Sequence, residues 1–96
     1  MGMYISLYKK NGDKFERSDE WEDQKFVKNG EAFSIITNNG FCIDKTQPFS
    51  DLDQYWRPKN FRKCREEINK LGVNKDIFNE LLDILEKNKD LYISYY

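Results

Sequence analysis

Apolar residues recur at helical spacing between Asn74 and Asn88, and the interpretation of the chain starts from this stretch. They form a stripe broader than a coiled-coil seam, while charged residues fall on the opposite side. The stripe consists of Ile77, Phe78, Leu81, Leu82, Ile84 and Leu85. We expect the side chain of Asn74 to cap this helix and Asp76 to favour its N-terminus. Such a helix must be covered by the strand-like segments around it.

A second, narrower amphipathic stripe precedes this helix. Its members recur at steps of three, four and three residues, which is typical of a helix. They are Phe61, Cys64, Ile68 and Leu71. Pro58 suits the first turn of this helix, and Gly72 suits the position just past its end. The pattern therefore predicts two consecutive helices near the C-terminal end.

Alternating apolar and polar residues predict strands over much of the remaining chain. The predicted strands are residues 3–8, 13–17, 25–28, 32–37, 41–43 and 91–96. Turns at Asn11-Gly12, Asn29-Gly30 and Asn39-Gly40 favour antiparallel pairing of successive strands. The segment Tyr92-Ile93-Ser94 repeats Tyr4-Ile5-Ser6, so we expect the first and last strands to share one sheet as neighbours.

Two segments have no regular pattern. Residues 18–23 are either an acidic loop that exposes Trp21 or a single helical turn. Residues 46–58 form a connector that contains both prolines of the chain. All predicted helices fall between the last two strands, which suits segregated layers rather than alternating strand–helix units. The sequence therefore predicts an α+β fold, in which an antiparallel sheet of four to six strands carries two C-terminal helices on one face, with a final edge or central strand.

The composition fits one folded domain over residues 1–96, because 39% of the residues are hydrophobic and 16% are aromatic. Disorder requires fewer apolar residues than this. Neither Cys42 nor Cys64 belongs to a C-x-x-C pair. We predict that both are small core residues in a reducing compartment, with a single disulfide as the alternative. No apolar run approaches the ~20 residues of a membrane span, so we expect a cytoplasmic protein.

The sequence contains no histidine. This excludes Ser-His-Asp and Cys-His catalysis and histidine-ligated metal sites. Two isolated cysteines cannot build a structural zinc site, and the glycines match turns rather than a phosphate-binding loop. We therefore expect no metal, no cofactor and no catalytic activity, with a carboxylate enzyme as the lowest-ranked alternative.

Two segments place aromatic residues among carboxylates. Aromatic side chains supply contact area at small entropic cost, and carboxylates select a basic partner. The candidate partner-binding residues are Asp51, Asp53, Tyr55, Trp56, Trp21 and Glu22. The alternative is that Phe49, Leu52 and Trp56 close the end of the core beneath the connector. The sequence does not show whether the two segments meet in space.

A basic stretch suggests a second kind of partner. Five cations occur within nine residues without an intervening acid, and they could grip phosphates while an aromatic residue stacks on a base. These residues are Arg57, Lys59, Arg62, Lys63 and Arg65. The alternative is a solvated helix face, and the net charge of −1 argues against a generally basic nucleic-acid binder.

The strands at the two ends of the sequence add a further hypothesis. Tyrosines recur on one side of both strands, and helices are expected to cover only the other side. The stripe is Tyr4, Tyr8, Tyr92 and Tyr96. An uncovered stripe of this kind could form a homodimer contact.

Ser50-Asp51-Leu52, Tyr55-Trp56 and Pro58 resemble the acidic-aromatic segment of the immunity proteins that block bacterial DNase toxins. The spacing differs by inserted residues and that family is all-helical, so no binding residue is carried over from it. The leading interpretation is a small non-catalytic protein-binding domain, an inhibitor or immunity-type protein that docks a basic protein. The alternative is a nucleic-acid-binding accessory domain that uses residues 57–65.

Overall fold

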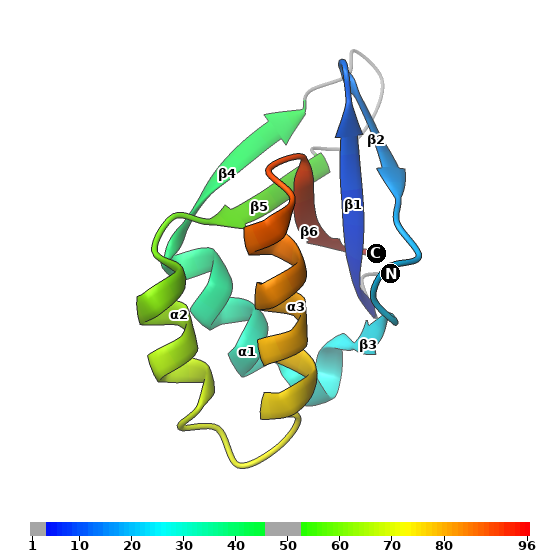
Figure 1. Ribbon diagram of the computed structural model, residues 1–96. Helices are drawn as coiled ribbons and strands as arrows, with labels where there is room; N and C mark the ends of the chain where they lie inside the picture. Colours follow the sequence, from blue (N-terminus) through cyan, green and yellow to red (C-terminus); the bar gives the residue numbers. More distant parts are fainter. Residues whose placement is uncertain (1–3, 46–52) are drawn as a thin grey trace.

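The computed structural model describes residues 4–45 and 53–96. The side chains of Asp44, Lys45 and Asp53 are outside this description. The elements, in chain order, are β1 (Tyr4–Asn11), β2 (Lys14–Arg17), β3 (Gln24–Lys25), α1 (Phe26–Asn38), β4 (Gly40–Lys45), β5 (Asp53–Pro58), α2 (Phe61–Ile68), α3 (Lys75–Lys87) and β6 (Leu91–Tyr95). Figure 1 shows the helices gathered on one side of the sheet, as the α+β prediction requires.

The sheet has six strands in the order β2-β1-β6-β5-β4, and the short β3 pairs with the start of β1. All of these pairings are antiparallel. The first and last strands are neighbours, as predicted, with Leu7 opposite Ile93 and Tyr8 opposite Tyr92. The hairpin at Asn11-Gly12 is also confirmed, and Gly12 adopts a φ of +64°, which glycine allows without steric cost.

The main core lies between the sheet and the helices. Ile5, Leu7 and Ile93 come from the sheet and have no exposed surface. The α3 stripe covers them, and its fully buried members are Phe78, Leu81, Leu82 and Leu85. Burying one such side chain contributes about 1.5–3 kcal/mol, so this stripe is a principal source of stability. The prediction of a helix that the strands must cover is therefore confirmed.

The helix starts differ in part from the prediction. Pro58 ends β5 instead of opening α2, and Asn60 caps α2 by accepting a 3.0 Å hydrogen bond from the backbone N–H of Lys63. Asn74 precedes α3 in a left-handed conformation with a φ of 57° and makes no side-chain cap. Its side-chain amide donates instead to the side-chain oxygen of Asn29, at 2.8 Å. A tertiary hydrogen bond has therefore replaced the local one.

The predicted hairpin over residues 25–37 is wrong, because α1 occupies this region. The buried positions Asn29, Ala32, Phe33 and Ile36 recur at helical spacing. The hairpin was predicted because Asn-Gly pairs are common in hairpin turns. Asn29 is not a hairpin turn but a kink, with φ −126° and ψ 17°, and its side chain donates to the carbonyl oxygen of Lys25 at 2.8 Å. Not all helices therefore lie between the last two strands.

The predicted connector over residues 46–58 is also wrong in its second half, because residues 53–58 form β5. Tyr55 and Trp56 point to opposite sides of this strand, since successive side chains alternate. At its far end β5 approaches β4 so closely that a Cβ on Gly40 would overlap the carbonyl oxygen of Arg57. Pro48, Phe49 and Leu52 lie outside the described residues.

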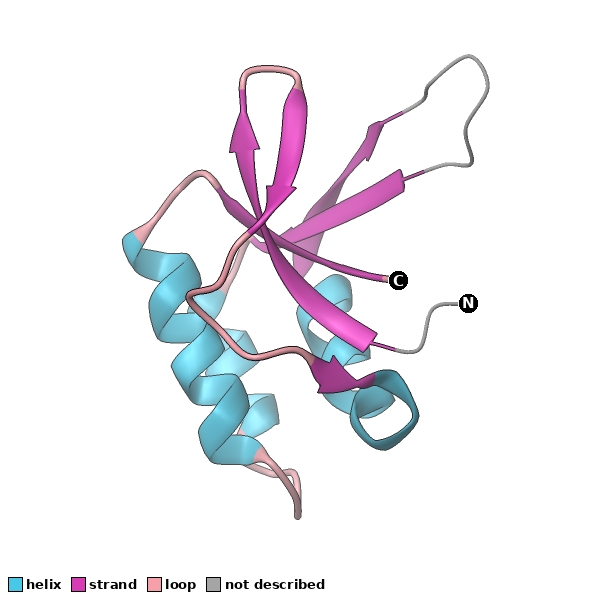
Figure 2. Cartoon of the chain, turned by 90° about the vertical axis from the view of Figure 1, so that its right-hand side faces the viewer, coloured by secondary structure: helices cyan, strands magenta, loops and turns pink. Residues whose placement is uncertain are grey.

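The sheet is strongly bent (Figure 2). We call the face that carries no helix among the described residues the outer face, and the β1–β2 and β4–β5 pairs lie on opposite sides of it. β2 and β5 are not neighbours in the sheet, yet the ring of Phe15 stacks on that of Tyr55 with 3.8 Å between centroids. Tyr92 meets Phe15 edge-on at 5.6 Å, and Tyr8 meets Tyr55 edge-on at 5.3 Å. These four rings, which we call the outer aromatic cluster, form a second small core on the face without helices.

Candidate functional site

The predicted acidic-aromatic segment near Tyr55 does not form an exposed surface in the described residues. Tyr55 is 8% exposed, because it is sealed within the outer aromatic cluster. Trp56 is half-buried on the helix side, where its ring meets Phe33 at 5.2 Å. The side chains of Asp51 and Asp53 lie outside the described residues. For Trp56 the alternative role, closing the core, therefore describes the structure better, and Tyr55 is buried on the opposite face of the sheet.

The predicted exposure of Trp21 is not found either. Residues 18–23 form a loop without a helix, and Trp21 is 4% exposed. Its indole N–H donates to the carbonyl oxygen of Ile77 at 3.2 Å, and its ring meets the edge of Phe78 at 5.5 Å. Trp21 therefore anchors the loop on α3, whereas the neighbouring Glu22 is exposed.

The anchored loop meets the end of β6 through Asp23. One carboxylate oxygen of Asp23 accepts from the Ser6 hydroxyl at 2.8 Å, and the other accepts from the Tyr96 hydroxyl at 2.5 Å. Arg17 makes an ion pair with the same carboxylate. The Arg17 guanidinium also lies 4.8 Å from the centre of the Tyr96 ring. Three segments of the chain thus contact a single carboxylate of the loop.

Tyr4 completes this arrangement from β1. Its ring stacks on that of Tyr96 at a centroid distance of 5.7 Å, and backbone hydrogen bonds of 3.0 and 2.9 Å join the two residues. Tyr4 is 37% exposed and Tyr96 is 42% exposed. Backbone hydrogen bonds and the contact with Asp23 therefore fix the two tyrosines, while a large part of each residue remains exposed to solvent.

The loop that carries Asp23 also carries three further acidic residues. Asp19, Glu20 and Glu22 are exposed, and none of them makes an ion pair within the described part of the chain. An open hollow of about 430 Å³ lies within the loop, between Asp19, Glu22 and Trp21. We name this surface the acidic-tyrosine patch. It comprises Tyr4, Asp19, Glu20, Glu22, Asp23 and Tyr96.

The electrostatics of the patch favour a cationic ligand. Of the four carboxylates of the loop, only Asp23 makes an ion pair within residues 4–45 and 53–96, and its partner is Arg17. The hydrogen bond to Asp23 raises the pKa of the Tyr96 hydroxyl above its ordinary value, with desolvation acting in the same direction. Tyr96 therefore stays neutral at physiological pH, and it remains a hydrogen-bond donor to Asp23.

The sequence predicted Glu22 and the tyrosines but not their combination. A signal was present, because antiparallel pairing of residues 4–8 with residues 92–96 places Tyr4 opposite Tyr96. The role of Asp23 had no such signal, since two of its partners, Ser6 on β1 and Tyr96 after β6, are distant in sequence.

The tyrosine stripe predicted for a homodimer is divided in the structure. Tyr4 and Tyr96 belong to the acidic-tyrosine patch, whereas Tyr8 and Tyr92 belong to the outer aromatic cluster. Tyr92 is 7% exposed, because Phe15 covers it from the hairpin of β1 and β2. The four side chains therefore do not form one uncovered surface.

The basic stretch is likewise divided. Arg57 is 8% exposed and donates to the carbonyl oxygens of Asn88 and Leu91 at 2.8 and 2.9 Å. Burial lowers the pKa of its guanidinium, against smaller opposing effects of Tyr92 and Asp90. Arg57 is therefore a structural residue that holds the turn before β6.

The other cations of this stretch face different surroundings. Arg65 is held by Asp83 at 2.8 Å and by Glu86 at 2.7 Å. Burial alone would lower the pKa of Arg65, but hydrogen bonds to Glu86 and Asp83 raise it overall. Arg62 pairs with Glu66 on the same helix, at 3.6 Å. Lys59 and Lys63 are exposed. The five cations do not line one phosphate-binding groove.

The two cysteines occupy unlike positions. Cys64 is fully buried in the main core, as predicted, and burial raises the pKa of its thiol to about 11, assisted by Glu67. Cys42 is exposed on β4, so the prediction that it is a core residue is wrong. β4 is the edge strand of the sheet, so it has a neighbouring strand on one side only.

Across residues 4–45 and 53–96, no group of three or more His, Cys, Asp or Glu side chains is placed to hold a metal ion. No helix in this part of the chain has the length and apolar character needed to cross a membrane. Comparison of the chain with models of known protein families, with curated proteins and with solved structures found no match.

Proposed function

We propose that this chain is a small non-catalytic protein-binding domain, of the inhibitor or immunity type, which docks a basic partner through the acidic-tyrosine patch. The observation that carries this proposal is the fixation of Tyr96 by Asp23, which presents two stacked tyrosine rings beside exposed carboxylates. A prearranged aromatic surface loses little conformational freedom on binding, so more of its contact energy contributes to affinity.

The charge of the patch supports a basic partner over an acidic or neutral one. Asp19, Glu20 and Glu22 are exposed, so they attract cations at a distance and accelerate encounter. Arg17 lies over the Tyr96 ring while it is paired with Asp23, so this surface already binds a guanidinium of its own. An arginine or lysine from a partner would find the same two kinds of contact, with the ring and with a carboxylate.

The proposal is tested by affinity capture on the immobilised chain, followed by isothermal titration calorimetry with the captured protein. Tyr96→Ala removes half of the stacked pair, and we expect it to weaken binding by about tenfold or more. Glu22→Lys reverses one exposed charge of the patch and should mainly slow association, most strongly at low salt.

Glu80→Lys is the matched control, because Glu80 is equally an exposed carboxylate but lies on α3. Binding that survives Glu80→Lys and is weakened by both patch variants supports the proposal. Equal binding by the wild type, Tyr96→Ala and Glu22→Lys would refute it, as would a captured partner without a basic surface.

A further inference from the structure

The acidic-tyrosine patch holds a cation that belongs to the chain itself, the guanidinium of Arg17. Phe15 and Arg17 lie on the same side of β2, because side chains alternate along a strand. Phe15 enters the outer aromatic cluster, whereas the Arg17 guanidinium lies 4.8 Å from the centre of the Tyr96 ring. The same guanidinium makes an ion pair with the Asp23 carboxylate. Asp23 and Tyr96 together therefore form a binding site for a guanidinium, which we call the guanidinium site.

The two walls of the guanidinium site are held in place by contacts that do not involve Arg17. Asp23 accepts from the Ser6 hydroxyl at 2.8 Å and from the Tyr96 hydroxyl at 2.5 Å. Backbone hydrogen bonds of 3.0 and 2.9 Å and ring stacking join Tyr96 to Tyr4. The carboxylate and the ring therefore keep their supports when Arg17 leaves the site.

A ring face beside a carboxylate suits a guanidinium better than an ammonium. A guanidinium is planar, so it can lie over an aromatic ring while its N–H groups reach a carboxylate. The ammonium of lysine is compact and more strongly hydrated, so it gains less from the ring. The contacts of Arg17 show that both interactions are made at once in this site. The site therefore favours arginine over lysine.

Arg17 is bound at the surface of the protein and can be exchanged. Its side chain is 54% exposed, and an exposed ion pair stabilises a fold little. Arg57 provides the contrast, because it is 8% exposed and donates to the backbone carbonyl oxygens of Asn88 and Leu91. Removing Arg57 leaves these acceptors without that donor, whereas Arg17 can move into solvent at small cost.

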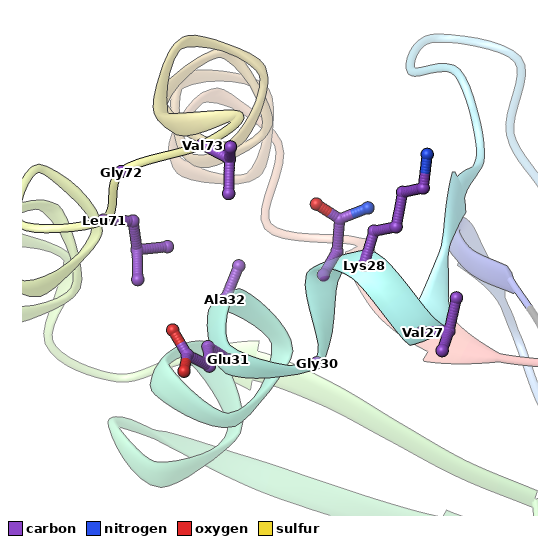
Figure 3. Close-up of a pocket in the computed structure, with 9 residues that line it drawn as sticks. Val27, Lys28, Gly30, Glu31, Ala32, Leu71, Gly72 and Val73 are labelled. Carbon is purple, nitrogen blue, oxygen red and sulfur yellow. The ribbon is translucent and has the colours of Figure 1, made fainter.

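A hollow of about 440 Å³ lies elsewhere on the surface, between residues 27–32 of α1 and residues 71–73 (Figure 3). Its lining combines apolar side chains with polar groups, and its charged side chains, Lys28 and Glu31, have opposite signs. Such a mixed lining selects no class of ligand. The guanidinium site differs because the chain itself supplies an example of the group that fits.

We propose that the basic partner inserts an arginine into the guanidinium site and displaces Arg17, which acts as an internal competitor in the free chain. This inference rests on the proposed function, since it names the side chain by which the partner engages the acidic-tyrosine patch. The incoming guanidinium takes over the ion pair with Asp23 and the contact with the Tyr96 ring. Arg17 moves into solvent, so the site has one occupant at a time.

The test is a nuclear magnetic resonance titration of the ¹⁵N-labelled chain with a synthetic peptide of alternating arginine and glycine. We expect saturable shifts of the Tyr4 and Tyr96 amides, together with a shift of the Arg17 Nε resonance toward that of a solvated arginine. The matched peptide with lysine should bind about fivefold more weakly. A peptide with neutral citrulline in place of arginine should leave these resonances unmoved.

Arg17→Ala removes the internal competitor and also identifies the Arg17 Nε resonance by its loss. We expect this variant to bind the arginine peptide about three- to fivefold more tightly than the wild type. The fold should persist, because the side chain of Arg17 is half exposed. Arg62→Ala is the matched control, since Arg62 is an exposed arginine paired with Glu66 on α2. It removes the same charge, so a gain common to both variants is a general charge effect.

Release of Arg17 by the arginine peptide, with tighter binding by Arg17→Ala than by Arg62→Ala, supports the proposal. It is overturned by no response to the arginine peptide, by an unmoved Arg17 resonance at saturation, or by equal binding of the lysine peptide. Equal affinities of Arg17→Ala and Arg62→Ala also overturn it.

The captured partner separates this inference from the proposed function. Partner binding that is weakened by Tyr96→Ala and Glu22→Lys but not strengthened by Arg17→Ala overturns the displacement of Arg17 and leaves the proposed function standing. Partner binding that none of these variants changes refutes the proposed function, and the inference with it.

Discussion

On the face of the sheet that carries the helices the buried apolar side chains of the strands are mostly aliphatic, whereas on the opposite face they are the aromatic rings of Tyr55 and Tyr92. Ile5, Leu7 and Ile93 on the first face are completely covered by another layer. On the second face no helix is present among the described residues, and the sheet covers itself by bending until Phe15 reaches Tyr55. Aromatic rings can fill the space between the two strand pairs, because each ring buries a large area and can pack either stacked or edge-on.

This difference explains where exposed tyrosines remain. The hairpin of β1 and β2 covers the middle of the outer face, so Tyr92 is buried and has little surface left for contact with a partner. At the end of β6, where Arg17 of β2 lies over the Tyr96 ring, Tyr4 and Tyr96 still keep 37% and 42% of their surface exposed. The acidic-tyrosine patch is therefore the uncovered continuation of the outer aromatic face.

The largest effect is expected on the helix face. Phe78→Ala should lower the free energy of unfolding by about 3–5 kcal/mol, because Phe78 is completely buried and its removal leaves a cavity in the main core. Urea denaturation followed by circular dichroism measures this loss. Val27→Ala, at a position 85% exposed, is the control and should change stability by less than about 0.5 kcal/mol.

A smaller loss is expected on the outer face. Tyr55→Ala should lower the free energy of unfolding by about 2 kcal/mol, since it removes one stacked and one edge-on ring contact on the outer face of β5. The same denaturation experiment applies. If Tyr55→Ala costs as much as Phe78→Ala, the outer aromatic cluster is a full core and the contrast between the faces is lost.

The two cysteines differ in burial, and the raised pKa of the buried one predicts how the stability of the fold depends on pH. The buried Cys64 thiol has its pKa raised from 9.0 to about 11, so the folded state keeps it neutral while the unfolded chain ionises it. The contribution of Cys64 to stability is therefore complete below about pH 9 and is lost as the pH rises toward about 11. We expect Cys64→Ala to flatten the stability profile in this window.

Thiol labelling offers an independent measurement of the same contrast. Near neutral pH a thiol-specific reagent should modify Cys42, which is exposed, well before Cys64. Equal labelling rates at the two positions in the folded protein would contradict the burial of Cys64.

The smallest effect concerns the uncovered end of the outer face. Asp23→Asn removes the charge that the Tyr96 hydroxyl contacts, so the pKa of Tyr96 should fall toward its ordinary value. Ultraviolet absorbance during a base titration reports this phenol, with Tyr96→Phe identifying its signal. An unchanged titration in Asp23→Asn would show that Asp23 does not hold the ring.

Local pattern predicted much of this fold. The apolar stripes at residues 61–71 and 77–85 indicated α2 and α3, because a helix buries one side whatever it packs against. The repeat of Tyr-Ile-Ser near both ends indicated the neighbouring strands β1 and β6. The α1 region was misjudged, since Asn29-Gly30 has the composition of a hairpin turn and only the packing of Phe33 and Ile36 selects a helix.

The sequence alone determined which residue types could act, and with no histidine it directed attention to aromatic side chains and carboxylates. Only the tertiary structure decided which of them reach the surface. Tyr55 and Tyr96 are the same residue type on the outer face of the sheet, yet the ring of Phe15 covers Tyr55 whereas Tyr96 is 42% exposed. Periodicity specifies the side of a strand on which a side chain lies, whereas covering depends on contacts between residues far apart in the chain.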